Sequence, residues 1–285
     1  MSRWTFGLFV LAVLGCATTR PSGPSRPESF TVVEGGAGQL RVSDGGSGGT
    51  PVVFVHGLGA DLEAWRAQLE HVRASRRAVA YDQRGHGASQ PASDGVYTIE
   101  ALAEDLNRVV SPLGLDRFVL VGHSLGGAVL TTYAGRHPEK LAALVYVDAV
   151  GDLSNAPPEL KTWFLHGPPN YGPQEAQAEF SEMLGPKAQP KTRERVLAAV
   201  SRVEPSTILA IRRSLGTFAP GPDVAHYTGP RMAIEAEEEQ PNPISASSSI
   251  PGVTRTTLPQ VSHWLMMDDP EGFNRALDQV LARVP

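Results

Sequence analysis

The chain has 285 residues, of which 29 are glycine and 24 are proline, and this density of turn-forming residues argues against a long-helix or fibrous protein. Hydrophobic residues make up 41% and charged residues 19%, so the chain is too apolar to be intrinsically disordered. The 25 basic and 30 acidic residues give a net charge of −5 without a basic cluster, which argues against a nucleic-acid partner. One enzyme-sized globular unit is the remaining prediction.

The beginning of the chain differs in composition from the rest. Arg3 precedes an apolar stretch, residues 4–14, which is too short to span a bilayer and has the layout of a secretory signal peptide. The segment Val-Leu-Gly-Cys that ends at Cys16 resembles a bacterial lipoprotein box, in which the cysteine becomes the lipidated first residue. Residues 1–16 are therefore predicted to be a signal peptide with a lipobox, and residues 17–29 a flexible tether. The expected location is the bacterial cell envelope, with a lipid anchor to a membrane at Cys16; a plain signal peptide that contains a cysteine is the alternative.

Strand-like and helix-like segments alternate in the next part of the chain. Phe30–Glu34 and Gln39–Ser43 are short β-type runs around a glycine-rich turn, which predicts an antiparallel hairpin. Apolar runs with the length of strands covered on both faces follow at Val52–Val55, Arg77–Tyr81, Phe118–Val121 and Leu144–Val147. Helix-like segments with amphipathic spacing lie between them at Leu62–Ala74, Ile99–Leu113 and Leu125–Arg136. This alternation predicts a mostly parallel α/β sheet.

The alternation stops between residues 151 and 222. This segment is interrupted by prolines and has helical periodicity at Gln174–Leu184, Thr192–Val203 and Thr207–Leu215, so it is predicted to be a helical cap. The sheet pattern then resumes with Arg231–Ile234 and Val253–Leu258, and an amphipathic helix closes the chain at Glu271–Arg283. Residues 30–150 and 223–285 are therefore predicted to form the core.

The pentapeptide Gly122-His123-Ser124-Leu125-Gly126 lies between a predicted strand and a predicted helix. In this context a G-x-S-x-G match indicates a sharp turn that presents a nucleophilic serine. The glycines allow a sharp turn in which neighbouring backbones approach closely, and the turn leaves the Ser124 hydroxyl clear of the sheet. The amide dipoles of the following helix point at the same place and would stabilise negative charge on a substrate oxygen. Ser124 is therefore predicted to be a catalytic nucleophile.

A serine nucleophile needs a general base within hydrogen-bond reach, and that base needs a third group that fixes its tautomer. Of the eight histidines, His263 follows the last predicted strand, so it lies at the carboxyl end of the sheet where Ser124 also emerges. His263 is the predicted base. His56, His86 and His123 lie on loops at the same end and are predicted to shape those loops through backbone hydrogen bonds.

Four motifs follow one another along the chain: His56-Gly57-Leu58-Gly59, the segment from Asp82 to Ser89, the Ser124 turn, and the His263 loop with Asp269-Pro270 after it. With these motifs the chain resembles the α/β-hydrolase fold superfamily, in the capped branch near epoxide hydrolases, haloalkane dehalogenases and haloperoxidase-type enzymes. The resemblance covers residues 30–284 and implies a mostly parallel eight-stranded sheet flanked by helices, with a helical cap. It also implies an oxyanion hole made by the backbone N–H groups of Leu58 and Leu125.

The resemblance places the third member of the triad, an acid, on Glu239, five residues beyond the seventh predicted strand. Glu237 and Glu238 belong to the same acidic run, so a small shift in the alignment would move the assignment to one of them. Asp148, at the end of the sixth predicted strand, is the position that some dehalogenases of the superfamily use, and it is the alternative acid. Asp82 is predicted to be a structural loop anchor.

These features predict a serine hydrolase that cleaves a carboxylic ester or related carbonyl substrate through an acyl-enzyme intermediate. Because Ser124 replaces the aspartate of some relatives, epoxide opening and halide displacement are disfavoured. Carbon–carbon bond hydrolysis or perhydrolysis by the same triad remains open, as does a catalytically silent envelope lipoprotein that binds a ligand. Trp163, Phe164 and Trp264 are predicted to contact an apolar small-molecule substrate, and packing of the cap onto the core is the alternative, favoured role of each. No sequence motif for a metal or cofactor is present, so none is expected.

Overall fold

The computed structural model describes residues 27–154, 156–238, 240 and 242–284. The predicted signal peptide with Cys16 lies outside these residues, as does most of the predicted tether. Ser29, the last residue assigned to the tether, already belongs to the first strand. Among the described residues, no helix is long and apolar enough to cross a bilayer.

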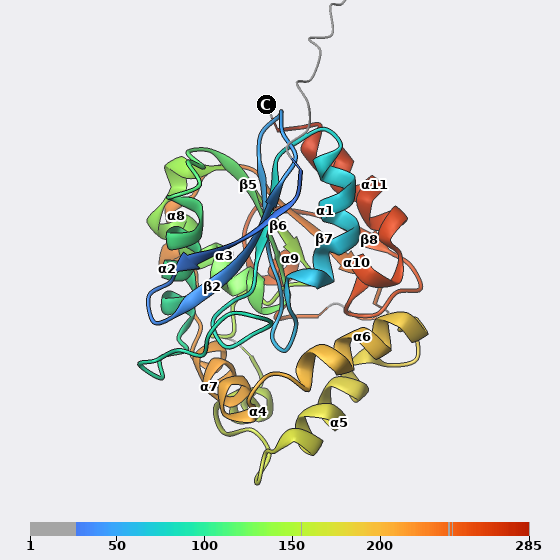
Figure 1. Ribbon diagram of the computed structural model, residues 1–285. Coiled ribbons are helices and arrows are strands. Elements are labelled where there is room, and N and C mark those ends of the chain that lie inside the picture. Colours follow the sequence, from blue (N-terminus) through green and yellow to red (C-terminus); the bar gives the residue numbers. More distant parts are fainter. Residues whose placement is uncertain (1–26, 155, 239, 241, 285) are drawn as a thin grey trace, which may run out of the picture.

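One twisted eight-stranded sheet forms the centre of the molecule, in the order β1-β2-β4-β3-β5-β6-β7-β8 (Figure 1). Its strands are β1 Ser29–Glu34, β2 Gln39–Gly45, β3 Val52–Val55, β4 Ala78–Tyr81, β5 Phe118–His123, β6 Leu141–Val147, β7 Arg231–Ala236 and β8 Val253–Leu258. β1 and β2 form the predicted hairpin, β2 pairs antiparallel with β4, and the remaining neighbours are parallel. The predicted α/β fold with a mostly parallel sheet is therefore confirmed.

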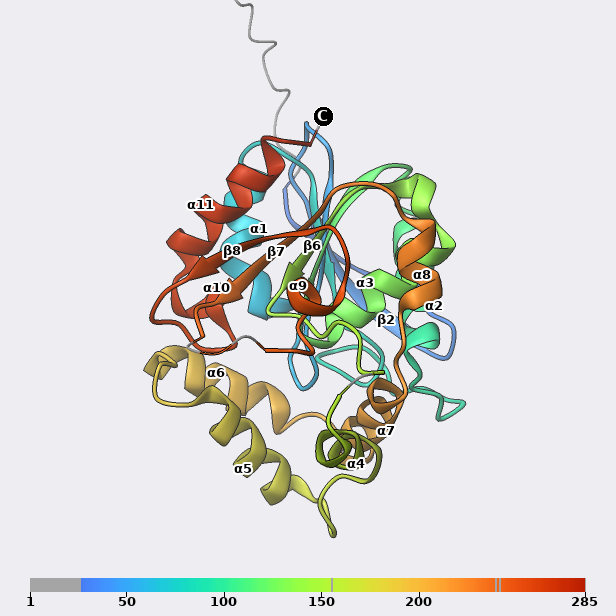
Figure 2. The same ribbon diagram turned by 180° about the vertical axis from the view of Figure 1, so that it is seen from behind.

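Helices cover both faces of the sheet and its carboxyl edge (Figures 1 and 2). The α-helices are α1 Arg66–Arg73, α2 Ile99–Val110, α3 Leu125–Arg136, α4 Pro158–His166, α5 Pro173–Leu184, α6 Pro190–Val200, α7 Pro205–Gly216, α8 Gly221–His226, α9 Ala246–Ser249, α10 Leu265–Asp268 and α11 Pro270–Leu281, with short 3-10 turns at Leu62–Trp65 and Pro138–Lys140. α1 and α11 cover one face, and α2, α3 and α8 cover the other.

Burial of apolar side chains accounts for this layering. Every residue of β3, β4, β5 and β6 is buried, as expected for strands sandwiched between helices. α2 begins where the Thr98 side chain accepts a hydrogen bond from the Ala101 backbone N–H, and it buries the stripe that includes Leu102 and Leu106. Ser124 and Asp148, which follow β5 and β6, are therefore attached to strands that are buried along their whole length.

Helices α4 to α7 are inserted between β6 and β7 and lie over the carboxyl ends of the strands (Figure 2). They approach the core closely: a Cβ on Gly59 would lie 2.6 Å from the Phe180 ring and 3.1 Å from the Val200 side chain. Sequence periodicity predicted α5, α6 and α7 but missed α4 and α8. α8 begins at Gly221, inside the segment predicted to be the cap, although it packs against α3 of the core.

Candidate active site

Ser124 occupies a strained turn between β5 and α3. Its backbone φ of 51° and ψ of −114° are unusual for a residue with a side chain, as expected for a nucleophile at a sharp strand-to-helix turn. Two glycines make the turn possible, because a Cβ on Gly122 would lie 2.5 Å from the Gly126 carbonyl oxygen. A Cβ on Gly126 would lie 2.5 Å from the Val55 carbonyl oxygen. The predicted close approach of neighbouring backbones is therefore present.

Two backbone amides are available beside this turn. Leu125 is the first residue of α3, and its N–H belongs to the end of the helix that lacks intrahelical partners. Leu58 lies on the loop after β3, and within the described part of the chain neither its N–H nor that of Leu125 donates a hydrogen bond to the protein. Both amides therefore remain free to bind a ligand oxygen.

Two buried, neutral histidines hold the Leu58 loop. His56 Nε2 accepts a hydrogen bond from the Gln83 N–H at 3.0 Å, and its Nδ1 donates to the Gly57 carbonyl at 2.8 Å. His86 Nε2 accepts from the Gly59 N–H at 3.2 Å. Burial lowers the pKa of His56 and lowers that of His86 to about 3, so both rings can act as acceptors.

His263 lies on the loop between β8 and α10, where its ring meets a carboxylate from the end of β6. Its Nδ1 is 2.6 Å from Asp148 Oδ2, and because a carboxylate only accepts, Nδ1 donates this hydrogen bond. The lone pair of the neutral imidazole is therefore on Nε2. The other carboxylate oxygen of Asp148 accepts from the Ala236 N–H at 3.2 Å. Asp148 has a φ of 41°, a strained conformation that aspartate tolerates better than most residues.

The acid first predicted from the sequence, Glu239, lies outside the described residues. The alternative, Asp148, makes the contact with His263. Glu237 and Glu238 have exposed side chains, and neither donates to nor accepts from His263 within the described residues. Partial burial raises the pKa of Glu238, and the nearby charges of Asp148 and Glu235 raise it further.

The His263 loop is joined to the Ser124 turn through His123. His123 Nε2 is 2.9 Å from the His263 carbonyl oxygen, and the two imidazole rings lie 4.6 Å apart between centroids. The structure therefore brings Ser124 and His263 to the same edge of the sheet. On its other side the loop is anchored by Asp268, whose Oδ2 accepts from the Ser262 N–H at 2.8 Å and from the Ser262 hydroxyl at 2.5 Å.

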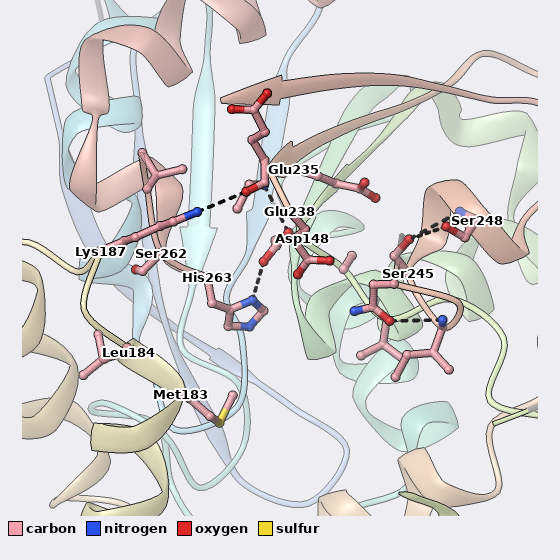
Figure 3. A pocket seen from close by; sticks show the side chains of 18 of the residues that line it. Asp148, Met183, Leu184, Lys187, Glu235, Glu238, Ser245, Ser248, Ser262 and His263 are labelled. Atoms are coloured by element: carbon pink, nitrogen blue, oxygen red, sulfur yellow. Dashed lines mark hydrogen bonds and ion pairs between the residues drawn. The ribbon is translucent and has the colours of Figure 1, made fainter. Parts of the chain in front are cut away.

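A cavity of about 360 Å³ opens beside the His263–Asp148 pair. Figure 3 shows the His263 ring and the Asp148 carboxylate facing each other on its wall. Its charged lining residues are Asp148, Lys187, Glu235, Glu237, Glu238 and Arg255, and the cap contributes Met183 and Leu184. Within the described residues, its lining does not include Ser124. The cavity therefore lies on the Asp148 side of His263, and its wall combines these charged groups with apolar side chains.

The aromatic residues predicted to contact substrate lie elsewhere. Trp264 is 2% exposed, packs edge-on against the His263 ring at 5.0 Å and contacts Phe180 of the cap. Trp163 and Phe164 lie on α4, and Trp163 stacks on the guanidinium of Arg212 at 4.3 Å. None of the predicted aromatic residues lines the cavity described above.

In the part of the chain that the structure describes, no group of three or more histidine, cysteine, aspartate or glutamate side chains is arranged to hold a metal ion. The backbone hydrogen bond predicted for His123 is present, but the sequence did not show that its partner lies on the His263 loop. Sequence reasoning also missed the anchor at Asp268, because neither partnership has a recognisable sequence pattern.

The family described as alpha/beta hydrolase fold matches residues 50–193, just over half of the chain. The chain belongs to this family. The solved structure of an esterase from Thermogutta terrifontis is 25% identical to it, with a TM-score of 0.74 and coverage of 90% of this chain and 98% of that one. The structural neighbours of this α/β-hydrolase therefore include esterases.

Two curated relatives match the chain over shorter stretches. The non-heme chloroperoxidase CPO-A1 of Kitasatospora aureofaciens is 43% identical over 104 residues, which are 36% of this chain and 38% of the relative. The dihydrolipoyllysine-residue acetyltransferase component of the acetoin cleaving system of Pseudomonas putida is 38% identical over 107 residues, which are 38% of this chain and 29% of the relative. The chain thus spans less than half the length of these relatives.

Proposed function

We propose that the protein is a serine hydrolase that cleaves a carboxylic ester or a related small-molecule carbonyl compound through an acyl-enzyme. The observation that carries this proposal is the 2.6 Å hydrogen bond from His263 Nδ1 to Asp148, made at the sheet edge where Ser124 occupies its strained turn. The bond leaves His263 Nε2 as the basic nitrogen, which is the atom that a serine hydroxyl needs as its proton acceptor.

The catalytic cycle starts when the Ser124 hydroxyl attacks the substrate carbonyl carbon and His263 Nε2 takes its proton. The carbonyl oxygen becomes negative and accepts hydrogen bonds from the Leu58 and Leu125 amides, while Asp148 stabilises the imidazolium. His263 then protonates the leaving alcohol, which departs and leaves the acyl group on Ser124. In the second half, His263 Nε2 removes a proton from water, and the resulting hydroxide attacks the acyl carbon. The bond from the acyl carbon to the Ser124 oxygen then breaks, His263 returns the proton to that oxygen, and the carboxylic acid is released.

Asp148 is the acid in this proposal, in place of Glu239. Its carboxylate is held in two directions, by the Ala236 N–H at 3.2 Å and by the His263 ring at 2.6 Å. Such a doubly held carboxylate fixes both the orientation and the tautomer of the imidazole. Trp163, Phe164 and Trp264 remain predicted substrate contacts, although none of them lines the cavity beside His263.

The comparisons support acyl chemistry. One solved neighbour is an esterase, and one relative is an acetyltransferase component, so both names describe acyl transfer. The chloroperoxidase relative favours perhydrolysis as the alternative, in which hydrogen peroxide replaces water in the second half of the cycle. A panel of short p-nitrophenyl esters, with and without hydrogen peroxide, separates the two.

The decisive experiment uses a fluorophosphonate probe, which reacts covalently with an activated serine. The full chain in detergent is expected to be labelled at Ser124, and Ser124→Ala is expected to show no labelling. A folded wild-type protein that is neither labelled nor active on any ester of the panel would contradict the proposal and favour a ligand-binding lipoprotein.

We also propose that the protein is exported and anchored by lipid at Cys16, on the basis of the sequence of residues 1–16. In a bacterial host, the mature amino terminus should carry a lipid mass on Cys16, and globomycin should block its processing. Cys16→Ser should abolish the lipid and release the protein from the membrane fraction. An unlipidated wild-type protein would rule out the anchor.

A further inference from the structure

His123, the residue before the nucleophile, is buried at the point where three parts of the site meet. Its side chain is 1% exposed. Its ring lies edge-on to Trp65 at 6.4 Å and is 4.6 Å from the His263 ring. A Cβ on Gly57, in the loop that carries Leu58, would lie 2.8 Å from His123 Nδ1. The ring is therefore surrounded by the nucleophile turn, the oxyanion loop and the base loop.

Hydrogen bonding determines the state of this ring. A carbonyl oxygen only accepts, so the 2.9 Å contact with the His263 carbonyl requires a proton on His123 Nε2. Nδ1 has no hydrogen-bond partner among the described residues. Burial lowers the pKa of His123 well below its usual value, and the neighbouring His263 lowers it further. The ring therefore stays neutral and keeps donating while His263 gains and loses its proton.

We propose that His123 is a positioning residue for the base: its Nε2–H holds the His263 backbone against the Ser124 turn and so fixes where the His263 imidazole stands relative to the Ser124 hydroxyl. This inference rests on the proposed function only for its effect on the rate. Asp148 orients the His263 ring from its Nδ1 side, and His123 fixes the main chain to which that ring is attached. Two separate hydrogen bonds thus set the orientation and the position of the base.

A matched pair of substitutions separates the hydrogen bond from simple packing. In His123→Gln the amide nitrogen lies the same number of bonds from Cβ as histidine Nε2, so it can donate to the His263 carbonyl. In His123→Met a methyl group of similar reach takes that place and cannot donate. Both variants lose the ring in equal measure, and they differ in the donor.

For His123→Met we expect kcat on a p-nitrophenyl ester to fall about 30-fold with KM unchanged within about twofold, because a displaced base slows the chemical steps and not substrate binding. His123→Gln should recover kcat to within about fivefold of wild type. Equal kcat values in the two variants, or a wild-type kcat in His123→Met, would overturn the inference.

A second readout does not depend on activity. The proton in the short hydrogen bond between His263 Nδ1 and Asp148 should give a far-downfield NMR resonance in wild type and in His123→Gln. It should broaden or vanish in His123→Met, because the loop that carries the ring is released. An unchanged resonance in His123→Met would refute the positioning effect. If wild type resists the fluorophosphonate probe and the resonance still depends on the donor, the serine hydrolase proposal fails while this inference stands.

Discussion

Replacing Asp148 by asparagine tests the assignment of the acid with little change of shape. Asparagine tolerates the positive φ of 41° at this position, so the turn after β6 should be retained. Its single carbonyl oxygen is needed as the acceptor for the Ala236 N–H, which Asp148 Oδ1 now provides at 3.2 Å. The amide NH₂ group then faces His263 Nδ1 and forces the ring into the tautomer with its proton on Nε2. That tautomer cannot accept the proton of Ser124.

The wrong tautomer and the lost charge together are expected to lower kcat about 10³- to 10⁴-fold, the size of the effect in well-studied triads. At about 1.4 kcal/mol per tenfold change, this corresponds to a loss of about 4 to 5.5 kcal/mol of transition-state stabilisation. The Asp148 side chain is 17% exposed, so solvent screens part of its charge. We therefore expect the loss of kcat to be near 10³-fold, the lower end of this range.

Steady-state hydrolysis of a short p-nitrophenyl ester and the rate of fluorophosphonate labelling measure this effect. Glu239→Gln is the matched control, since it neutralises the acid that the sequence resemblance favoured, and it should keep kcat within about threefold of wild type. If Asp148→Asn stayed within tenfold of wild type while Glu239→Gln lost three orders of magnitude, the base would be oriented by Glu239 and our reasoning would be wrong.

Three further predictions concern the framework of the site and the stability of the fold. Gly126→Ala should abolish labelling of Ser124 and lower the free energy of unfolding by about 2 kcal/mol, because its Cβ would lie 2.5 Å from a backbone oxygen of β3; Gly221→Ala, with open space around it, should change neither. Burial opposes ionisation of Glu28, but hydrogen bonds from Ser43 and two arginines lower its pKa to about 2, below its ordinary value of 4.5. Glu28→Gln should therefore lower Tm by about 2 °C at pH 7, and this difference should disappear as the pH falls from about 4.5 toward 2, where wild type also loses the charge. Burial lowers the pKa of His86 from 6.5 to about 3. Between these two pH values the ring is protonated in the unfolded chain and neutral in the folded chain. Between pH 7 and pH 5, the free energy of unfolding measured in urea should fall by about 2 kcal/mol more for wild type than for His86→Gln. Equal decreases would show that the folded chain protonates this ring.

Strands and helices could be predicted where their buried apolar residues form a continuous run or recur at a regular spacing. β3 begins and ends at the predicted residues, since its apolar run is buried on both faces. The run at Leu144–Val147 also predicted a strand, but β6 begins at Leu141, because the alanines between carry little strand signal. α4 was missed: Phe164 is its only buried residue among those described, so it has no apolar stripe to recognise.

Within the site, local geometry was predictable and long-range partnership was not. Ser124 and its two glycines lie within five consecutive residues, so the turn could be read directly from the sequence. The partner of His263 lies 115 residues away in the chain. Several carboxylates follow β6 and β7, and the sequence does not show which strand end faces the base. The resemblance pointed to β7, where Glu239 follows, while the contact that forms comes from β6.

An acid at the end of β6 has a structural consequence. β5 and β6 are parallel neighbours in which His123 pairs with Val147, so Ser124 and Asp148 follow directly after paired residues. The spacing between the proposed nucleophile and the proposed acid is then set by one fully buried strand pair. His263 bridges that pair through its ring to Asp148 and through its carbonyl to His123. Glu237 and Glu238, which follow β7, line the adjoining cavity instead of contacting His263.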